Sequence, residues 1–193
     1  MMISDYKALV SQISYERASR YREKLAAGFL PGRLLQNQLD KTNRDVGKMS
    51  VALFLEALVR SKRPQIFAES AVVGDGSDWN LTELGLLGDI AIAAPVTFFD
   101  NGRHQNPNIH QPPFRGMLLF VAGALLRNGR SHTPADWEEV VNAEGNIDEE
   151  AYYQLYERRL LPSFLYVNEQ MRQRGRQAFI TVPGLGCGQF AGA

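Results

Sequence analysis

The sequence predicts an α/β fold, in which a mixed sheet layered with helices follows an α-helical amino-terminal region. Two observations carry this prediction. Through residues 1–65, apolar residues recur at the spacing of a helix, with turn signals between the periodic segments. From residue 66 onward, runs typical of strands alternate with helical segments, which is the order expected of a sheet covered by helices. We therefore expect a helical extension at 1–65 that packs on an α/β core at 66–193.

The size and composition of the chain favour one domain. With 193 residues, of which 45% are hydrophobic, the chain can bury a core of ordinary size. The 21 basic and 21 acidic residues cancel, so no global field favours a nucleic acid or a membrane as partner, although a neutral total can contain a local basic patch. The single cysteine, Cys187, excludes an internal disulfide framework. Composition and net charge therefore favour no particular class of partner.

Targeting signals are sparse in this sequence. The amino-terminal residues lack the apolar core and the small-residue cleavage site of a signal peptide, and no run of about eighteen apolar residues is present. We expect a cytoplasmic protein, or one secreted without a cleaved signal peptide.

The first 65 residues are expected to form three helices. The first runs from Asp5 to Ala27, with its charges opposite its apolar residues. The segment Gly28–Gly32, with the sequence GFLPG, breaks this periodicity, and a second helix begins near Arg33. The third follows Ser50 as its N-cap and stops at Pro64.

Strands are expected at three places after residue 65. The runs at Ile66–Gly76 and Asp89–Asp100 both end in turn residues, and AFITV at 178–182 is rich in β-branched and aromatic residues. The apolar run Gly116–Leu126 is compatible with a buried strand or a buried helix. The segment between 100 and 110 is crowded with Asn, Gly, Pro and His, and is expected to be a loop.

Two helices are expected between these strands. The first begins at Thr133 as N-cap, with Pro134 at its first helical position. The second runs from Asp148 to about Gln173, is kinked or divided at Pro162, and ends before Gly175.

The segment that follows AFITV is the most glycine-dense in the chain. Glycines at 184, 186 and 188 permit close approach of backbone amides to a phosphate, because glycine has no Cβ and allows positive φ. Gly186, Gly188 and Ala191 match G-x-G-x-x-A, but no helix, strand and acid follow as in a dinucleotide fold. No Lys-Ser or Lys-Thr follows as in a P-loop. A tight turn is the structural alternative.

The stretch FITVPGLGCGQFAG resembles the strand and second phosphate-binding loop of the macrodomain family, whose members bind ADP-ribose. In that family an apolar strand leads through glycines to an aromatic residue. The resemblance covers residues 66–193 and is specific in the last dozen. It implies that backbone amides contact the diphosphate, that the aromatic residue contacts the distal ribose, and that ADP-ribose is the ligand without a further cofactor. The implied binding residues on this loop are Gly184, Leu185, Gly186, Cys187, Gly188, Gln189 and Phe190.

Two acids are candidates for the carboxylate that accepts from the adenine amino group in macrodomains. Asp75 follows a predicted strand in VVGDG, and Asp89 lies in a Gly-Asp-Ile motif. We favour Asp75 because of the strand before it, while a turn-forming role stays open for both acids. The Asn-Ala-Ala-Asn and triple-glycine signatures are absent, so the sequence resembles a divergent branch akin to macrodomain-like effector proteins of intracellular bacteria.

The loop after residue 100 holds the candidate catalytic groups. Asp100 or Asn101 can hold ribose hydroxyls or position a water, and His104 can move a proton. A carboxylate there can also stabilise the positive charge that develops when a glycosidic bond to ADP-ribose breaks. The alternative is a purely structural turn. A metal site formed with His110 matches no standard zinc spacing, so no metal is predicted.

Three functions stay open at this stage. The chain binds ADP-ribose and hydrolyses it from modified proteins, or it recognises ADP-ribose without catalysis, or its helices dock a protein partner and it binds no nucleotide. A diphosphate loop normally leads into a helix whose N-terminal amides hold the anion. We therefore expect the core to be incomplete at its carboxyl end.

Overall fold

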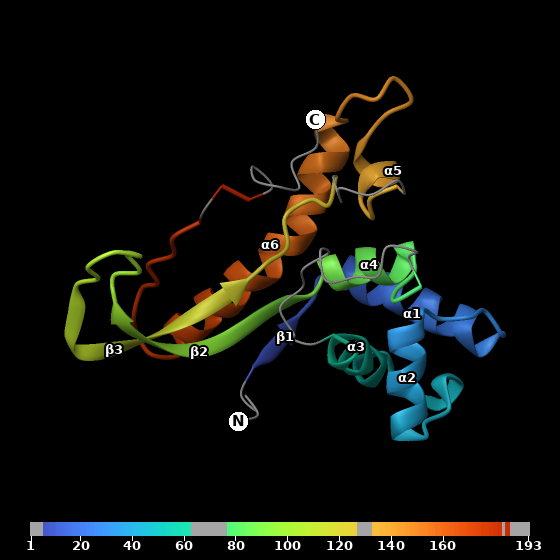
Figure 1. Cartoon of the computed structure of the whole chain (residues 1–193), viewed down its shortest axis with the longest axis horizontal. Helices are drawn as coiled ribbons and strands as arrows, with labels where there is room; N and C mark the ends of the chain where they lie inside the picture. The colour runs from blue at the N-terminus through green and yellow to red at the C-terminus, as the bar shows by residue number, and fades with distance from the viewer. Residues whose placement is uncertain (1–5, 63–76, 127–132, 183, 186–193) are drawn as a thin grey trace.

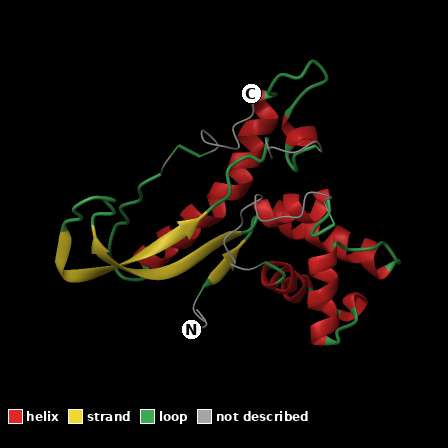
Figure 2. Cartoon of the chain, viewed as in Figure 1, coloured by secondary structure: helices red, strands yellow, loops and turns green. Residues whose placement is uncertain are grey.

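The computed structural model of the chain describes residues 6–62, 77–126, 133–182 and 184–185 (Figure 1). Most of the helices gather at one end of the molecule, a long hairpin extends from them toward the other end, and one long helix runs beside the strands (Figure 2). In chain order the elements are β1 (Lys7–Leu9), α1 (Gln12–Ala26), α2 (Arg33–Thr42), the 3₁₀ turn η1 (Val46–Lys48), α3 (Val51–Arg60), α4 (Leu81–Gly88), β2 (Ala91–Asp100), β3 (Ile109–Phe120), α5 (Trp137–Val140) and α6 (Glu149–Arg172).

The described part of the sheet has three strands in the order β1-β2-β3, and both pairings are antiparallel. A mixed sheet was expected, so the combination of helices and sheet is confirmed while the strand pairs in the described segments are antiparallel. Ile92 lies opposite Phe120 at the base of the hairpin, and Phe98 lies opposite Phe114 further out, with a register shift before Asp100. The base of β2 is buried and its outer half is largely exposed, because the helices cover only the inner end.

The main core lies among α1, α2, α3, α4 and the base of the sheet. Leu35, Phe54 and Leu58 are fully buried there, and Ile92 and Leu125 join the same cluster from the second half of the chain. The core therefore combines side chains from both sides of residue 65, the boundary expected between extension and core. A smaller cluster beneath α5 and α6 consists of Ala124, Leu126, Val140 and Leu155.

Several predicted helix ends are confirmed. The α1 helix stops before the GFLPG segment, and α2 begins at Arg33. Ser50 caps α3 by accepting from the Leu53 N–H, and Asp148 caps α6 by accepting from the Ala151 N–H. Pro162 lies within α6 without dividing it. Among the described helices, none is long and apolar enough to cross a bilayer.

Three predicted elements differ from the structure. The first helix begins at Gln12 instead of Asp5, because Ser11 accepts from the Ser14 N–H and Lys7–Leu9 pair with β2. The helix expected from Thr133 begins at Trp137, after a turn in which the Trp137 N–H donates to the Pro134 carbonyl. Residues 178–182 are not a strand, and Phe179 is 93% exposed, because these residues pair with no described strand and propensity alone forms no sheet.

Of two further predicted segments, one is part strand and part irregular structure, and the other is not described. In Gly116–Leu126, for which strand and helix were both open, β3 continues to Phe120 and irregular structure follows. The whole of the strand expected at Ile66–Gly76 lies outside the described residues, so it stays a prediction.

Candidate functional site

The structure describes six of the predicted site residues: Asp89, Asp100, Asn101, His104, Gly184 and Leu185. The others lie outside the described residues and stay predictions: Asp75, Gly186, Cys187, Gly188, Gln189 and Phe190.

Asp100, Asn101 and His104 lie together at the tip of the β2–β3 hairpin. The Asp100 Oδ1 accepts from the Gly102 N–H at 2.7 Å. The Asn101 Oδ1 accepts from the N–H groups of Arg103 at 3.3 Å and Asn108 at 3.1 Å. His104 is exposed. The tip therefore combines a carboxylate, an amide and an imidazole at the surface, where they can reach a ligand, and two of the three also stabilise the turn.

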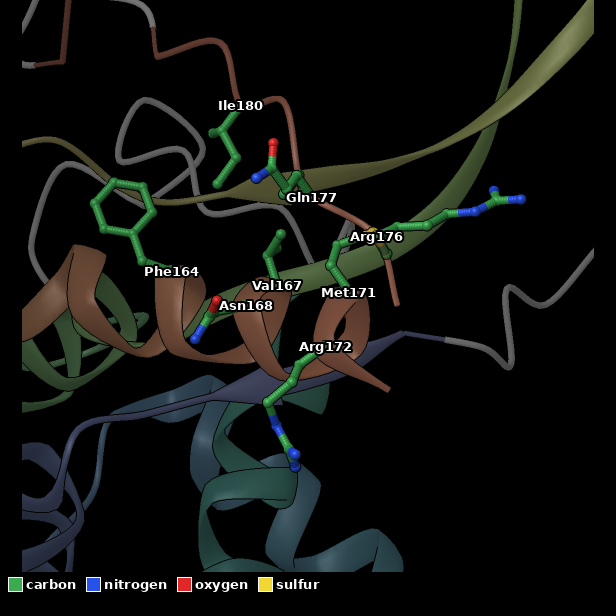
Figure 3. Close-up of a pocket in the computed structure, with 9 residues that line it drawn as sticks. Phe164, Val167, Asn168, Met171, Arg172, Arg176, Gln177 and Ile180 are labelled. Atoms are coloured by element: carbon green, nitrogen blue, oxygen red, sulfur yellow. The ribbon is translucent and has the colours of Figure 1, made fainter. Parts of the chain in front are cut away.

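An open groove lies between α6 and the segment 176–180, close in sequence to Gly184. Its volume is about 490 Å³. Figure 3 shows Ile180 and Gln177 above the helix, while the guanidinium groups of Arg172 and Arg176 extend away from the groove. The residues that line it are Phe164, Val167, Asn168, Met171, Arg172, Arg176, Gln177, Ala178 and Ile180. Apolar side chains with the amides of Asn168 and Gln177 among them suit a ligand that has a ring and polar groups.

Asp89 lies inside the molecule instead of at an open surface. It follows α4 directly and is 1% exposed. Its Oδ2 accepts from the Ser14 Oγ at 3.1 Å, the Arg17 Nη1 at 3.0 Å and the Arg158 Nε at 2.9 Å. Its Oδ1 accepts from the Arg159 Nε at 3.2 Å. Both oxygens are therefore occupied by protein groups, and the predicted contact of Asp89 with adenine stays a prediction.

The arginines around Asp89 bind further acceptors. Arg159 also donates to the Asp136 Oδ1 and to the Gly123 carbonyl, both at 2.8 Å. The Arg158 Nη1 lies 2.6 Å from the Glu139 Oε1. Burial alone would lower the pKa of Arg159, but the carboxylates of Asp136 and Asp89 outweigh it, so the pKa is raised. These guanidinium groups are fixed cations that join α1, α4, α5 and α6.

A second buried carboxylate, Glu83, is held by neutral donors. Its Oε1 accepts from the Tyr21 hydroxyl at 2.7 Å and from the Gly32 N–H at 2.9 Å. Its Oε2 accepts from the Asn80 N–H at 3.2 Å, which completes a capping box at the start of α4. Burial raises the pKa of Glu83, while the hydrogen bonds from Tyr21, Gly32 and Asn80 oppose that rise.

Neither buried cluster, that of Asp89 or that of Glu83, was predicted from the sequence. One signal for the first was the Arg158–Arg159 pair inside the apolar stripe of the predicted helix, since a buried arginine requires a carboxylate partner. For the second, the spacing Asn80-x-x-Glu83 is that of a capping box. In the described segments, no group of three or more His, Cys, Asp and Glu side chains could hold a metal ion.

Comparison with known proteins identifies one family. The model of the family described as "Macrodomain effector MavL" matches residues 6–193. A search of curated proteins finds no match.

Proposed function

This chain belongs to the MavL family of macrodomain effectors, and from that membership we propose that it binds ADP-ribose through the glycine-rich loop at 184–190. The observation that carries the proposal is the extent of the match, which includes both the helices and the loop. Membership supports ADP-ribose binding in general, and the loop is the part of the sequence best suited to a diphosphate. Its alternating glycines leave backbone N–H groups free of Cβ atoms that would hinder the anion.

The groove beside α6 supports this placement of the ligand. The segment that forms one wall of the groove is followed in the sequence, within a few residues, by Gly184 at the start of the glycine-rich loop. Phe164, Val167 and Ile180 offer an apolar surface for a ribose or a base next to the diphosphate.

Hydrolysis of ADP-ribose from a modified protein is the finer proposal. Asp100 would stabilise the positive charge at the anomeric carbon, Asn101 would orient a water or a ribose hydroxyl, and His104 would transfer the proton. The presence of all three side chains at one exposed tip supports this assignment. We propose that the chain, as an effector, acts in a cytoplasm and reaches it without a cleaved signal peptide.

A non-catalytic module that recognises ADP-ribosylated proteins is the second candidate. One observation favours it: the side chains of Asp100 and Asn101 already cap the hairpin turn. Side chains used in this way are common in turns that have no catalytic role.

Calorimetric titration of the chain with ADP-ribose, AMP and NAD tests the binding proposal. We expect saturable binding of ADP-ribose that Gly188→Val abolishes, because a valine Cβ blocks close approach of the diphosphate. Gly47→Val is the matched control, since Gly47 lies in η1, which is remote from the loop in the sequence. A chain that binds none of the three ligands would favour the helical protein-interaction function instead.

Asp100→Asn separates the two candidate functions. The amide retains an oxygen that can accept from the Gly102 N–H, so the turn is preserved while the charge is removed. If the chain is a hydrolase, release of ADP-ribose from a modified protein falls by about 10²-fold or more while ADP-ribose affinity is kept. Binding by the unmodified chain without any release of ADP-ribose would establish the recognition module.

A further inference from the structure

The connection between α1 and α2 ends in an exposed apolar tip. Phe29 is 54% exposed and Leu30 is 80% exposed. In Figure 1 this connection forms the right-hand extremity of the molecule, at the end opposite the β2–β3 hairpin. Both side chains are therefore more than half exposed at this end of the molecule, and the Phe29 ring also meets the ring of buried Tyr21 edge-on, with the ring centroids 6.1 Å apart.

Backbone hydrogen bonds fix the tip in this exposed position. The Phe29 N–H donates to the Lys24 carbonyl at 3.0 Å, and Gly28 turns the chain with a φ of +99°. On the other side of the tip, the Gly32 N–H donates to Glu83 at 2.9 Å and the Arg33 N–H donates to the Ser77 carbonyl at 2.7 Å. Exposure of these two residues is therefore built into the fold.

A shallow hollow of about 540 Å³ adjoins the tip and continues its apolar surface. Leu25, Pro31 and Val46 contribute to this surface. Asp40 and Asp45 also line the hollow; Lys48 compensates the charge of Asp45, whereas the partner of Asp40 is a neutral amide. The Asp40 Oδ1 accepts from the Gln36 Nε2 at 2.7 Å, and Asp45 accepts from the Gly47 N–H and pairs with Lys48.

The first 62 residues carry an excess of positive charge in a chain that is neutral as a whole. The first 62 residues contain eleven Lys and Arg against six Asp and Glu, whereas the rest of the chain contains ten against fifteen. Lys24 and Arg44 flank the tip, and Arg20 lies one turn before Lys24 on α1. All three are exposed, and none forms an ion pair with any residue that the structure describes.

We propose that this tip docks on a bilayer surface that contains anionic lipid. Phe29 and Leu30 enter the interface between headgroups and acyl chains, and Lys24, Arg20 and Arg44 contact the anionic headgroups. Reversible attachment to a membrane requires two signals, apolar insertion and basic residues, and this end of the molecule supplies both. An exposed apolar tip with Lys24, Arg20 and Arg44 nearby suits the negatively charged surface of a bilayer. This inference is independent of ADP-ribose binding.

Co-sedimentation of the full chain with lipid vesicles tests the proposal. We expect the chain to sediment with phosphatidylcholine vesicles that contain phosphatidylserine, and to stay in solution with phosphatidylcholine alone. The double substitution Phe29→Ser and Leu30→Ser should weaken binding by at least about tenfold, because both side chains lose their transfer into the interface. Lys24→Glu with Arg44→Glu should weaken vesicle binding more than added salt weakens binding of the unmodified chain, because salt only screens the charges that the substitutions reverse.

Phe99→Ser is the matched control, because Phe99 is 62% exposed on the hairpin at the opposite end of the molecule. It should leave vesicle binding unchanged. The double variant loses the contact between the Phe29 and Tyr21 rings, so its melting temperature is measured as well, and a variant that is folded at the assay temperature excludes unfolding as the cause. The proposal is overturned if the unmodified chain ignores both kinds of vesicle, which would leave the tip to a protein partner. It is also overturned if the double variant binds as well as the unmodified chain.

Discussion

Two buried carboxylates at opposite ends of the short helix α4 are compensated in opposite ways. Asp89, after the last residue of the helix, accepts from three arginines and a serine. Glu83, in the first turn, accepts from a tyrosine hydroxyl and two backbone N–H groups. The exposed fractions are 1% for Asp89 and 0% for Glu83, so the difference comes from the partners and not from burial.

The comparison shows what each kind of partner does for the fold. Arginines deliver positive charge, so Asp89 forms ion pairs that tie together helices far apart in the sequence. Neutral donors stabilise the charge of Glu83 only through hydrogen bonds, and burial still raises its pKa. The Asp89 cluster is therefore a fixed structural element, and the Glu83 cluster can gain a proton.

Asp89→Asn is the substitution with the largest expected effect. It removes the charge that compensates three arginines, two of which are buried, and leaves them beside a neutral amide. Breaking one partner of a buried ion pair costs about 3–5 kcal/mol of unfolding free energy. Urea denaturation measures this loss, and Asp148→Asn is the matched control, since asparagine is an equally good N-cap at the exposed start of α6.

The same variant distinguishes the structural role of Asp89 from the predicted contact with adenine. If Asp89 serves the fold, the folded fraction of the variant binds ADP-ribose with unchanged affinity. A variant with unchanged stability and a large loss of affinity would contradict the comparison, because the carboxylate would then have to leave its arginines to reach the ligand.

Two glycines test how rigid the clusters are, and a methyl group added at either is expected to cost about 1–3 kcal/mol. A Cβ at Gly32 would lie 2.6 Å from the Trp79 Cα and 2.8 Å from the Asp78 carbonyl oxygen. A Cβ at Gly88 would lie 2.6 Å from the Arg159 Nη2. Gly32→Ala should be at the upper end of this range because backbone must move.

Gly88→Ala tests the rigidity of the arginines around Asp89, because the end of the Arg159 side chain is what obstructs the added methyl group. If hydrogen bonds to Asp89, Asp136 and Gly123 hold that side chain, the substitution is costly. Gly116→Ala is the control, since its Cβ would meet at 2.5 Å the Phe98 ring, which is 42% exposed and can move by giving up its stacking on the Phe114 ring. Equal melting temperatures for the two variants would contradict a rigid arginine cluster.

The fold was predictable where local signals were strong. Ser50, Asp148 and the GFLPG segment act through the backbone next to them, so the ends of three helices could be predicted. Strand pairing depends on partners distant in the sequence. For this reason Lys7–Leu9 was predicted as helix and is a strand, and AFITV was predicted as strand and is irregular.

For the candidate site, the sequence could predict which residue types are present but not what surrounds them. The turn after residue 100 was recognised from its Asn and Gly content, and the structure places its polar groups at one tip. The surroundings of Asp89 could not be predicted from the Gly-Asp-Ile motif. Its partners Ser14, Arg17 and Arg158 come from elements about seventy residues away, and only packing of the helices brings them together.

Glu83→Gln is the substitution with the smallest expected effect near neutral pH. The amide oxygen can still accept from Tyr21 and Gly32, and only the Asn80 N–H loses its acceptor, so the cost is about 1 kcal/mol. Part of this cost is offset because the variant no longer buries a charge. The same chemical change thus costs much less at Glu83 than at Asp89, although both are buried.

The pH dependence of the Glu83→Gln effect tests the protonation of Glu83. Since the pKa of Glu83 is raised in the folded chain, the folded state binds more protons than the unfolded state above the ordinary glutamate pKa of about 4.3. The unfolding free energy of the unmodified chain therefore falls relative to that of the variant as the pH rises from that value through the raised pKa. Above the raised pKa the difference is constant. Urea denaturation of both proteins over this range measures the difference, from which all other titrating groups cancel. A difference that does not vary with pH would mean that the hydrogen bonds from Tyr21, Gly32 and Asn80 fully offset the effect of burial on the pKa of Glu83.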